Sequence, residues 1–254
     1  MSGVINEVRR LPSLPSAAPE TVESSRGALG DRQVLLLATW FSPAFPIGGF
    51  TFSHGLELAI VDGMVRDAST LEGWVGAVVQ HGGGWSDAVM LAEAWHAAAA
   101  DDRERLLAAV ELAEALAPSA ERQHETLSLG RAFLDAVDAG WPSPTVSRLR
   151  RRTDTGPAHP IAVAIAAAAH ALPLAPTLAG YLNNFAAGLV SVAVRLVPLG
   201  QSDGLRVVAT LQPLIVAIAE RAASSTLDEI GSATVMSDVA SLRHEALHSR
   251  VFRS

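Results

Sequence analysis

The chain has 254 residues, of which 49% are apolar, 18% charged and 5% aromatic, with a formal net charge of −7. These values fit one large domain or two small ones with a hydrophobic core, exclude disorder throughout, and argue against non-specific nucleic-acid binding, which needs a basic surface. Because the chain has no Cys and all 19 basic residues are Arg, disulfides, thiolate metal sites, Walker-A phosphate loops and Schiff-base chemistry are excluded as well.

The first 30 residues are predicted to be a flexible extension. Arg9 and Arg10 are not followed by an apolar run, so the segment is not a signal peptide, and its Ser and Pro content is typical of disorder. We expect one helical domain over residues 31–235 and a docking tail over residues 236–254.

Hydrophobic periodicity is helical along nearly all of that domain. Apolar residues share one helical face in each of two segments: Leu71, Trp74, Val75, Val78 and Val79, and then Leu127, Gly130, Leu134 and Val137. The start and stop signals agree with this pattern. Ser69 and Glu72 form a capping box, whereas Gly63 and Gly140 stand where helices should end.

The middle of the chain predicts further helices. Residues 101–117 should form one helix, and its core face should consist of Leu106, Val110 and Ala113. The glycines at 82–84 indicate a flexible connection between helices rather than a phosphate loop, because no strand precedes them. The segment from Pro160 to Val194 has no charged residue, but prolines interrupt it, which favours two buried helices over a membrane span.

The last third continues the pattern. Pro198 should end the helix that carries Tyr181 to Val197, Asp203 can cap the next helix, and Pro213 should kink that helix. No segment alternates apolar and polar residues between hairpin turns, so no strand is expected. The prediction is an all-α protein with a single domain of roughly eight to ten helices, in which the high Ala content favours helices.

One motif suggests catalysis. Residues 244–248 read H-E-x-x-H, the pattern in which two imidazoles on one helical face bind Zn²⁺ and the Glu is a general base. A catalytic zinc site needs a third protein ligand, and none of the six residues after His248 is suited to be one. A zinc-dependent hydrolase is therefore only the alternative function, and the residues define no active site.

The other histidines are scattered, which disfavours a stably bound metal. We expect His170 in the core of an Ala-rich helix, and we expect His54 and His81, which stand beside Gly, to be exposed without a carboxylate partner. The basic run at Arg148 and Arg150–Arg152 should be a solvated face; docking of an acidic partner is the second interpretation.

Three sequence blocks together resemble one family. They are SPAFPIGGFTFSHGLE at residues 42–57, AVRLVPLGQSDG at residues 193–204, and HEALHSRVFRS at residues 244–254. In this order and at these positions they are similar to the urease accessory protein UreF family, and the resemblance extends from about Val34 to Ser254. The three patterns are long and independent of one another, so their conjunction is specific.

The resemblance implies an all-helical, non-enzymatic protein of a family that usually forms homodimers. Because no signal peptide or membrane span is predicted, we expect the chain to be cytoplasmic. It would bind the accessory protein UreD (also called UreH), recruit the GTPase UreG, and assist delivery of nickel to the urease apoprotein. No cofactor would be bound stably, because nickel would be handled by the complex. A partner GTPase also fits the residues, since a chain without Lys lacks a phosphate loop. Neither a nucleic acid nor a membrane is expected as a partner.

The resemblance assigns roles to the three blocks. The partner-binding tail would act through His244, Glu245, Arg250, Phe252 and Arg253, because Arg and aromatic residues are common interface anchors. The loop would present a UreG-binding or channel-lining surface through Pro46, Gly48, Gly49, Phe50 and Glu57. The turn would be held, or would contact a partner, through Arg195, Pro198, Gly200, Gln201 and Asp203.

Three positions depart from the family pattern. Phe52 and His248 each replace a common Tyr, and Val251 replaces a common Leu. The Phe removes a hydroxyl, so any hydrogen bond that this group makes in the family is lost here.

Overall fold

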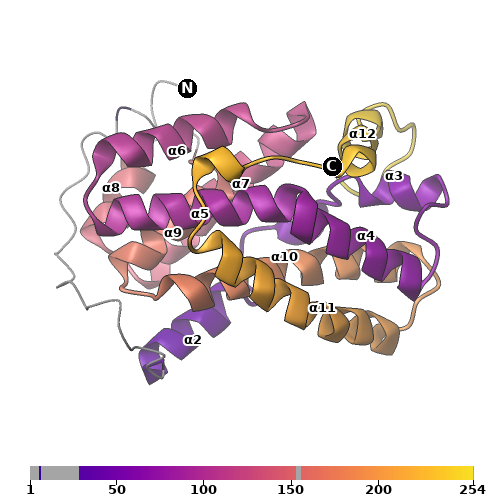
Figure 1. Cartoon of the computed structure of the whole chain (residues 1–254), viewed down its shortest axis with the longest axis horizontal. Helices are drawn as coiled ribbons and strands as arrows, with labels where there is room; N and C mark the ends of the chain where they lie inside the picture. Colours follow the sequence, from indigo (N-terminus) through magenta and orange to yellow (C-terminus); the bar gives the residue numbers. More distant parts are fainter. Residues whose placement is uncertain (1–5, 7–28, 153–155, 254) are drawn as a thin grey trace.

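The computed structural model of the chain describes residue 6, residues 29–152 and residues 156–253. The predicted flexible extension therefore lies almost entirely outside the described residues. Within the described part every regular element is a helix and no strand occurs, which confirms the all-α prediction (Figure 1). In chain order the elements are α2 Asp31–Trp40, η1 Gly49–Thr51, α3 Leu56–Val61, α4 Ala68–His81, α5 Gly83–Ala99, α6 Arg103–Ala115, α7 Ala120–Gly140, α8 Pro144–Arg152, α9 His159–Ala169, α10 Leu174–Leu196, α11 Gln201–Ala222, η2 Leu227–Glu229 and α12 Val235–His244.

The centre of the fold is the pair α5 and α9. Helix α5 runs across the middle of the molecule and contacts α4, α6, α9 and α10 (Figure 1). Both helices are rich in Ala, and α9 is buried continuously from His159 to Ala167. Small side chains let helices approach closely, and Ala has the highest helix propensity, so composition and packing support each other here.

Helices α10 and α11 form a second layer. They pack against each other and against α4, and Pro173 and Pro198 lie just outside the two ends of α10. Each helix is long and apolar enough to cross a membrane by length and composition alone. Half of the most apolar stretch of α10 and a third of that of α11 is buried inside the protein, as expected for helices that turn one face to a core.

The helix caps correct two local predictions. The N-cap of α4 is Asp67, whose carboxylate accepts from the Thr70 amide at 2.8 Å, so the helix begins before the predicted Ser69–Glu72 box. Asp67 therefore caps the amide of Thr70, whereas a cap at Ser69 would have satisfied the amide of Glu72. The glycines at 82–84 do not form a flexible connection, because Gly82 is the direct junction between α4 and α5.

The predicted helix over residues 101–117 is slightly shorter in the structure. It runs from Arg103 to Ala115 with Asp102 as its N-cap, and its three predicted core residues are buried. In α11 the N-cap is Gly200, and Asp203 returns to it by accepting from its amide at 3.1 Å. Helix α11 continues through Pro213 to Ala222.

The chain after α11 crosses the central helix before it reaches α12. The Trp85 indole of α5 donates to the Glu229 carbonyl at 2.9 Å, and Arg221 lies 3.6 Å from the centre of the Trp85 ring. Helix α12 then packs beside the short helix α3, where the chain ends (Figure 1). The fold therefore brings the C-terminal block to the first block, about 190 residues earlier in the chain.

Candidate functional site

The first and third sequence blocks meet at Glu57. This residue lies on α3 and is only 3% exposed. One of its carboxylate oxygens accepts from the Val251 amide at 2.7 Å, and the other accepts from the Phe252 amide at 3.0 Å. A buried carboxylate is costly unless it is hydrogen-bonded, so the tail backbone supplies what the burial of Glu57 requires.

His244 completes this arrangement from the end of α12. Its ring is fully buried, with Nε2 at 3.0 Å from Glu57 Oε2 and Nδ1 at 2.8 Å from Glu121 Oε2. The other oxygen of Glu121 forms an ion pair with Arg250 of the tail. We call Glu57, His244 and Glu121 the carboxylate–imidazole bridge, since one ring joins carboxylates from α3 and α7.

The Phe252 ring is the apolar anchor of the tail. It is 4% exposed, and the guanidinium carbon of Arg195 lies 4.6 Å from the ring centre. The same guanidinium donates to the Phe50 carbonyl at 3.2 Å, and the Arg253 amide donates to the Thr51 carbonyl at 2.9 Å. Arg195 thus connects loop and tail directly, which assigns it an intramolecular role.

The remaining predicted residues of the first and third blocks lie around this junction. Glu245 accepts from the Ala120 amide at 3.2 Å, at the N-terminus of α7. In the loop, Gly48 has a φ of +74°, a backbone conformation that suits Gly, and Gly49 begins the 3₁₀ turn η1. Pro46 and Phe50 are exposed, so their side chains are available to a partner.

The residues of the second block beyond Arg195 make local contacts. Pro198 and Gln201 are exposed, and Gly200 and Asp203 cap α11 as described above. Asp203 also pairs with Arg206 one turn later, at 2.5 Å. These residues stabilise the link between α10 and α11, whereas Arg195 is the predicted residue of this block that contacts the tail.

The H-E-x-x-H pattern does not form a zinc site. Helix α12 ends at His244, and His248 lies in the exposed, non-helical tail, so the two imidazoles do not share a helical face. Both nitrogens of His244 already face carboxylate oxygens. Among the described residues no group of three or more His, Cys, Asp or Glu side chains is placed to hold a metal ion.

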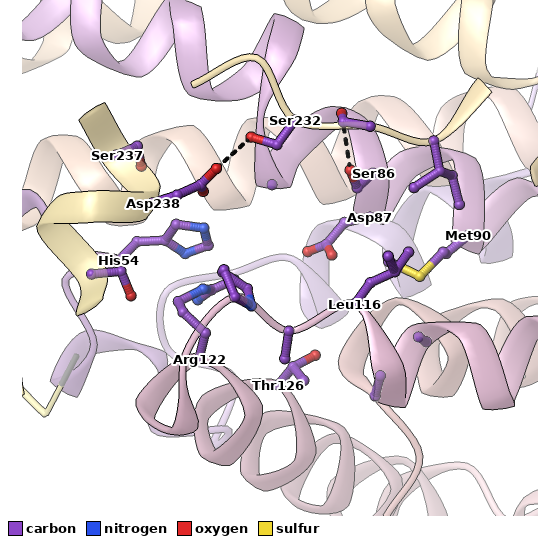
Figure 2. Close-up of a pocket in the computed structure, with 18 residues that line it drawn as sticks. His54, Ser86, Asp87, Met90, Leu116, Arg122, Thr126, Ser232, Ser237 and Asp238 are labelled. Atoms are coloured by element: carbon purple, nitrogen blue, oxygen red, sulfur yellow. Dashed lines mark hydrogen bonds between the residues drawn. The ribbon is translucent and has the colours of Figure 1, made fainter. Parts of the chain in front are cut away.

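A pocket of about 160 Å³ has several charged residues in its lining. Figure 2 shows Asp87 of α5, Arg122 of α7, Asp238 of α12 and His54 turned toward the same space. Burial raises the pKa of Asp87 to about 6, although its carboxylate accepts from the Tyr181 hydroxyl at 2.7 Å. An acid of this kind changes charge near neutral pH, where an ordinary Asp does not.

The structure corrects the prediction for His54. Its side chain is 7% exposed rather than solvated, and its Nδ1 lies 3.5 Å from the Glu125 carboxylate. Burial, together with the Arg122 guanidinium, lowers the pKa of His54, so the ring is kept neutral. Burial works to raise the pKa of Glu125, but Arg122, to which it is ion-paired, and His54 outweigh that effect and lower it.

A second pocket of about 210 Å³ lies on the other side of His54. Its walls include Phe52 and Phe185, and its polar groups include His159 and Glu125. Burial lowers the pKa of His159 to about 4. His54 lines both pockets, and the pair Tyr181–Asp87 also reaches from one to the other. The His54–Glu125–Arg122 cluster therefore separates two cavities with carboxylate and imidazole linings.

The sequence reasoning missed this cluster for a physical reason. Arg122 and Glu125 are three residues apart on α7, so an ion pair was readable from their spacing. The contact of Glu125 with His54 joins distant parts of the chain, so it follows only from the tertiary fold.

Three other side-chain predictions have clear outcomes. His170 lies at the C-cap of α9 and is only partly buried, so its placement in the core was wrong. In the basic run, Arg150 pairs with Asp135 at 2.8 Å rather than facing only solvent. His81 is exposed, as predicted.

Comparison with known proteins gives a consistent result. The sequence model of the UreF family matches residues 65–212. The urease accessory protein UreF of Rhodopseudomonas palustris (strain BisB5) is 44% identical over 245 residues, which cover 96% of this chain and 98% of that protein. The UreF proteins of Methylobacterium sp. (strain 4-46) and Bradyrhizobium diazoefficiens (strain USDA 110) are 46% and 44% identical; the alignments cover 87% and 86% of this chain and 88% and 90% of theirs.

These matches extend over nearly the whole chain, and the three blocks that carry the resemblance are joined by the contacts of Glu57 and Arg195 with Phe252. The chain belongs to the urease accessory protein UreF family.

Proposed function

We propose that this chain is a non-enzymatic scaffold for urease maturation. It binds UreD (UreH) through its tail, recruits the GTPase UreG, and assists the GTP-dependent insertion of nickel into apo-urease. The observation that supports this proposal best is the junction at Glu57, where the first family block holds the C-terminal block against the body of the chain.

The surface around the tail suits a protein partner. Helix α12 turns an apolar face to solvent through Val235, Met236, Val239 and Leu242. These side chains recur at helical spacing, and Val251 of the tail is exposed as well. A contiguous exposed apolar surface is typical of an interaction site, so UreD is proposed to cover this face and the tail together.

The loop suits a second partner. The Phe50 side chain is 69% exposed, and its backbone carbonyl accepts a hydrogen bond from Arg195. An exposed aromatic side chain therefore projects from a backbone that is fixed in position. An aromatic group positioned in this way is a favourable interface anchor. We assign UreG to this surface, because a chain without Lys cannot supply the phosphate-binding loop that GTP hydrolysis needs.

Nickel is the cargo of this assembly and not a resident ligand of the chain. The two pockets that share His54 are lined by carboxylates and imidazoles, which are suitable transient ligands for a divalent ion. The proposal includes a homodimer in the cytoplasm. Exposed Leu205 and Val216 on α11 offer an apolar surface for the second copy.

A retention experiment tests the two partner assignments separately. The tagged full-length chain should retain both UreD and UreG from a mixture of the purified proteins. A chain that ends at His244 should lose UreD, whereas Phe50→Ala should keep UreD and lose UreG. Undiminished UreD retention by the shortened chain would refute the tail assignment, and undiminished UreG retention by Phe50→Ala would refute the loop assignment.

A further inference from the structure

The His244 ring, which lies between the body of the chain and the tail, faces more carboxylate acceptors than a neutral ring has N–H groups to satisfy. The two ring nitrogens of His244 lie 3.0 and 2.8 Å from oxygens of Glu57 and Glu121. A nitrogen and a carboxylate oxygen at such distances need a hydrogen between them. A neutral imidazole carries one N–H, so it can donate to only one of the two carboxylates.

For both contacts to be hydrogen bonds, the bridge must hold two protons. Whether the second proton resides on the ring or on a carboxyl group, the three side chains share it through these two contacts. Loss of that proton leaves one nitrogen lone pair facing a carboxylate oxygen, and it leaves two anionic groups on either side of a neutral ring. Both changes oppose the geometry in the structure.

The same carboxylate that faces His244 also fixes the tail. Glu57 Oε2 faces His244 Nε2 and accepts from the Phe252 amide, while Oε1 accepts from the Val251 amide. Glu121 in turn holds Arg250. Each carboxylate of the bridge thus has one contact with His244 and at least one with the tail, so a shift of either carboxylate moves the tail contact as well.

We propose that the carboxylate–imidazole bridge is a proton-controlled latch for the tail. With two protons it holds residues 250–253 against α3 and α7. When the pH rises and one proton leaves, the tail separates from the body of the chain. This inference concerns the isolated chain and does not depend on the partner assignments above.

Several of the other charged groups near the bridge have partners of their own. On the packed elements these groups are Asp62 of α3, Arg122 and Glu125 of α7, Asp238 and Arg243 of α12, Glu245 and Arg253 of the tail, His54 before α3, and His81 at the end of α4. Arg243 pairs with Asp62 at 2.8 Å, and Glu245 accepts from the Ala120 amide. Arg122 pairs with Glu125, beside His54. Among the described residues, the groups in contact with His244 are therefore the two bridge carboxylates.

Hydrogen exchange of two amides tests the latch in the full-length protein. The Val251 and Phe252 amides donate to Glu57, so their exchange, divided by the intrinsic rate at each pH, reports tail docking directly. We expect their protection to fall about tenfold or more when the pH is raised from about 6 to about 8.5. The His244 ring ¹⁵N resonances should shift over the same pH interval.

Two variants separate the bridge from a general effect of pH. His248→Gln makes the same chemical change at an exposed site of the tail and should keep the pH dependence of the wild type. His244→Gln should abolish the pH dependence and lower protection at the acidic end. Protection in the wild type that is constant over this interval overturns the proposal without any variant, and so does a ring ¹⁵N transition that occurs without loss of protection.

Discussion

Asp87 shows at the residue scale how the pocket changes an ordinary side chain. Its pKa is raised from 3.8 to about 6, mainly by burial, while the Tyr181 hydroxyl donates to its carboxylate. A carboxyl group whose pKa is higher in the folded protein than in the unfolded chain makes the folded state more stable when it is protonated than when it is ionised. This advantage in the free energy of unfolding therefore exists only at low pH. That advantage is lost as the pH rises through about 6.

The substitution Asp87→Asn should therefore stabilise the protein at alkaline pH. The amide oxygen can still accept from Tyr181, and the cost of a buried anion is removed. We expect a gain of about 1–3 kcal/mol in the free energy of unfolding at pH 8, and almost none near pH 4, since a shift of one pKa unit corresponds to about 1.4 kcal/mol. Urea unfolding at the two pH values measures this, and an equal effect at both would contradict the assignment.

Which residues belong to the site could be predicted from the sequence, but the contacts that they make could not. The resemblance selected Glu57, His244 and Arg250 because they lie in its motifs, but it assigned Glu57 to a loop surface and the others to a partner. Neither periodicity nor spacing could show that Glu57 and His244 touch, because 187 positions separate them. The contact depends on the packing of α12 on α3, which is a property of the whole fold.

At the scale of elements, the close approach of α7 and α9 is decided by one glycine. A Cβ added to Gly130 would collide with the Pro157 carbonyl and lie 3.1 Å from the His159 amide nitrogen. Both obstacles are backbone atoms at the start of α9, which cannot rotate away as a side chain can. The packing of two buried helices therefore requires Gly at this position.

Gly130→Ala should lower the free energy of unfolding by about 2–3 kcal/mol, the usual cost of overpacking a core, despite the better helix propensity of Ala. Gly73→Ala in α4 is the matched control, because an added Cβ there meets no atom within 4 Å. That variant should gain about 1 kcal/mol from propensity alone. Denaturant unfolding of both variants compares them, and a stabilising Gly130→Ala would show that α7 and α9 are less tightly packed than the structure has them.

Helices were the most predictable feature of the chain. Residues 101–117 and the faces at Leu71 and Leu134 were found because their apolar spacing is a local property. The caps were less certain: Asp67 and Ser69 lie two positions apart and both residue types are good N-caps, so the sequence did not show which of them begins the helix. The Gly82 junction was misjudged because composition does not distinguish a flexible linker from a tight contact between two helices.

At the scale of the whole molecule, the tail connects regions that no local signal joins. Phe252 is buried at 4% exposure, whereas its neighbour Val251 is 71% exposed. Phe252→Ala should lower the free energy of unfolding by up to about 3 kcal/mol, because it removes a buried aromatic ring. Val251→Ala should change it by less than about 0.5 kcal/mol. Thermal unfolding compares the two variants, and equal stability of both would mean that the tail is not docked in solution.

The same pair of variants tests the central claim, that this chain acts in urease maturation through its docked C-terminal block. The measurement is the nickel content per urease molecule purified from cells that carry the urease genes and one variant of this chain. Wild type and Val251→Ala should yield fully loaded urease, whereas Phe252→Ala and a chain ending at His244 should yield mostly apo-urease. Normal nickel loading in cells that lack the tail, or that lack this chain altogether, would contradict the account.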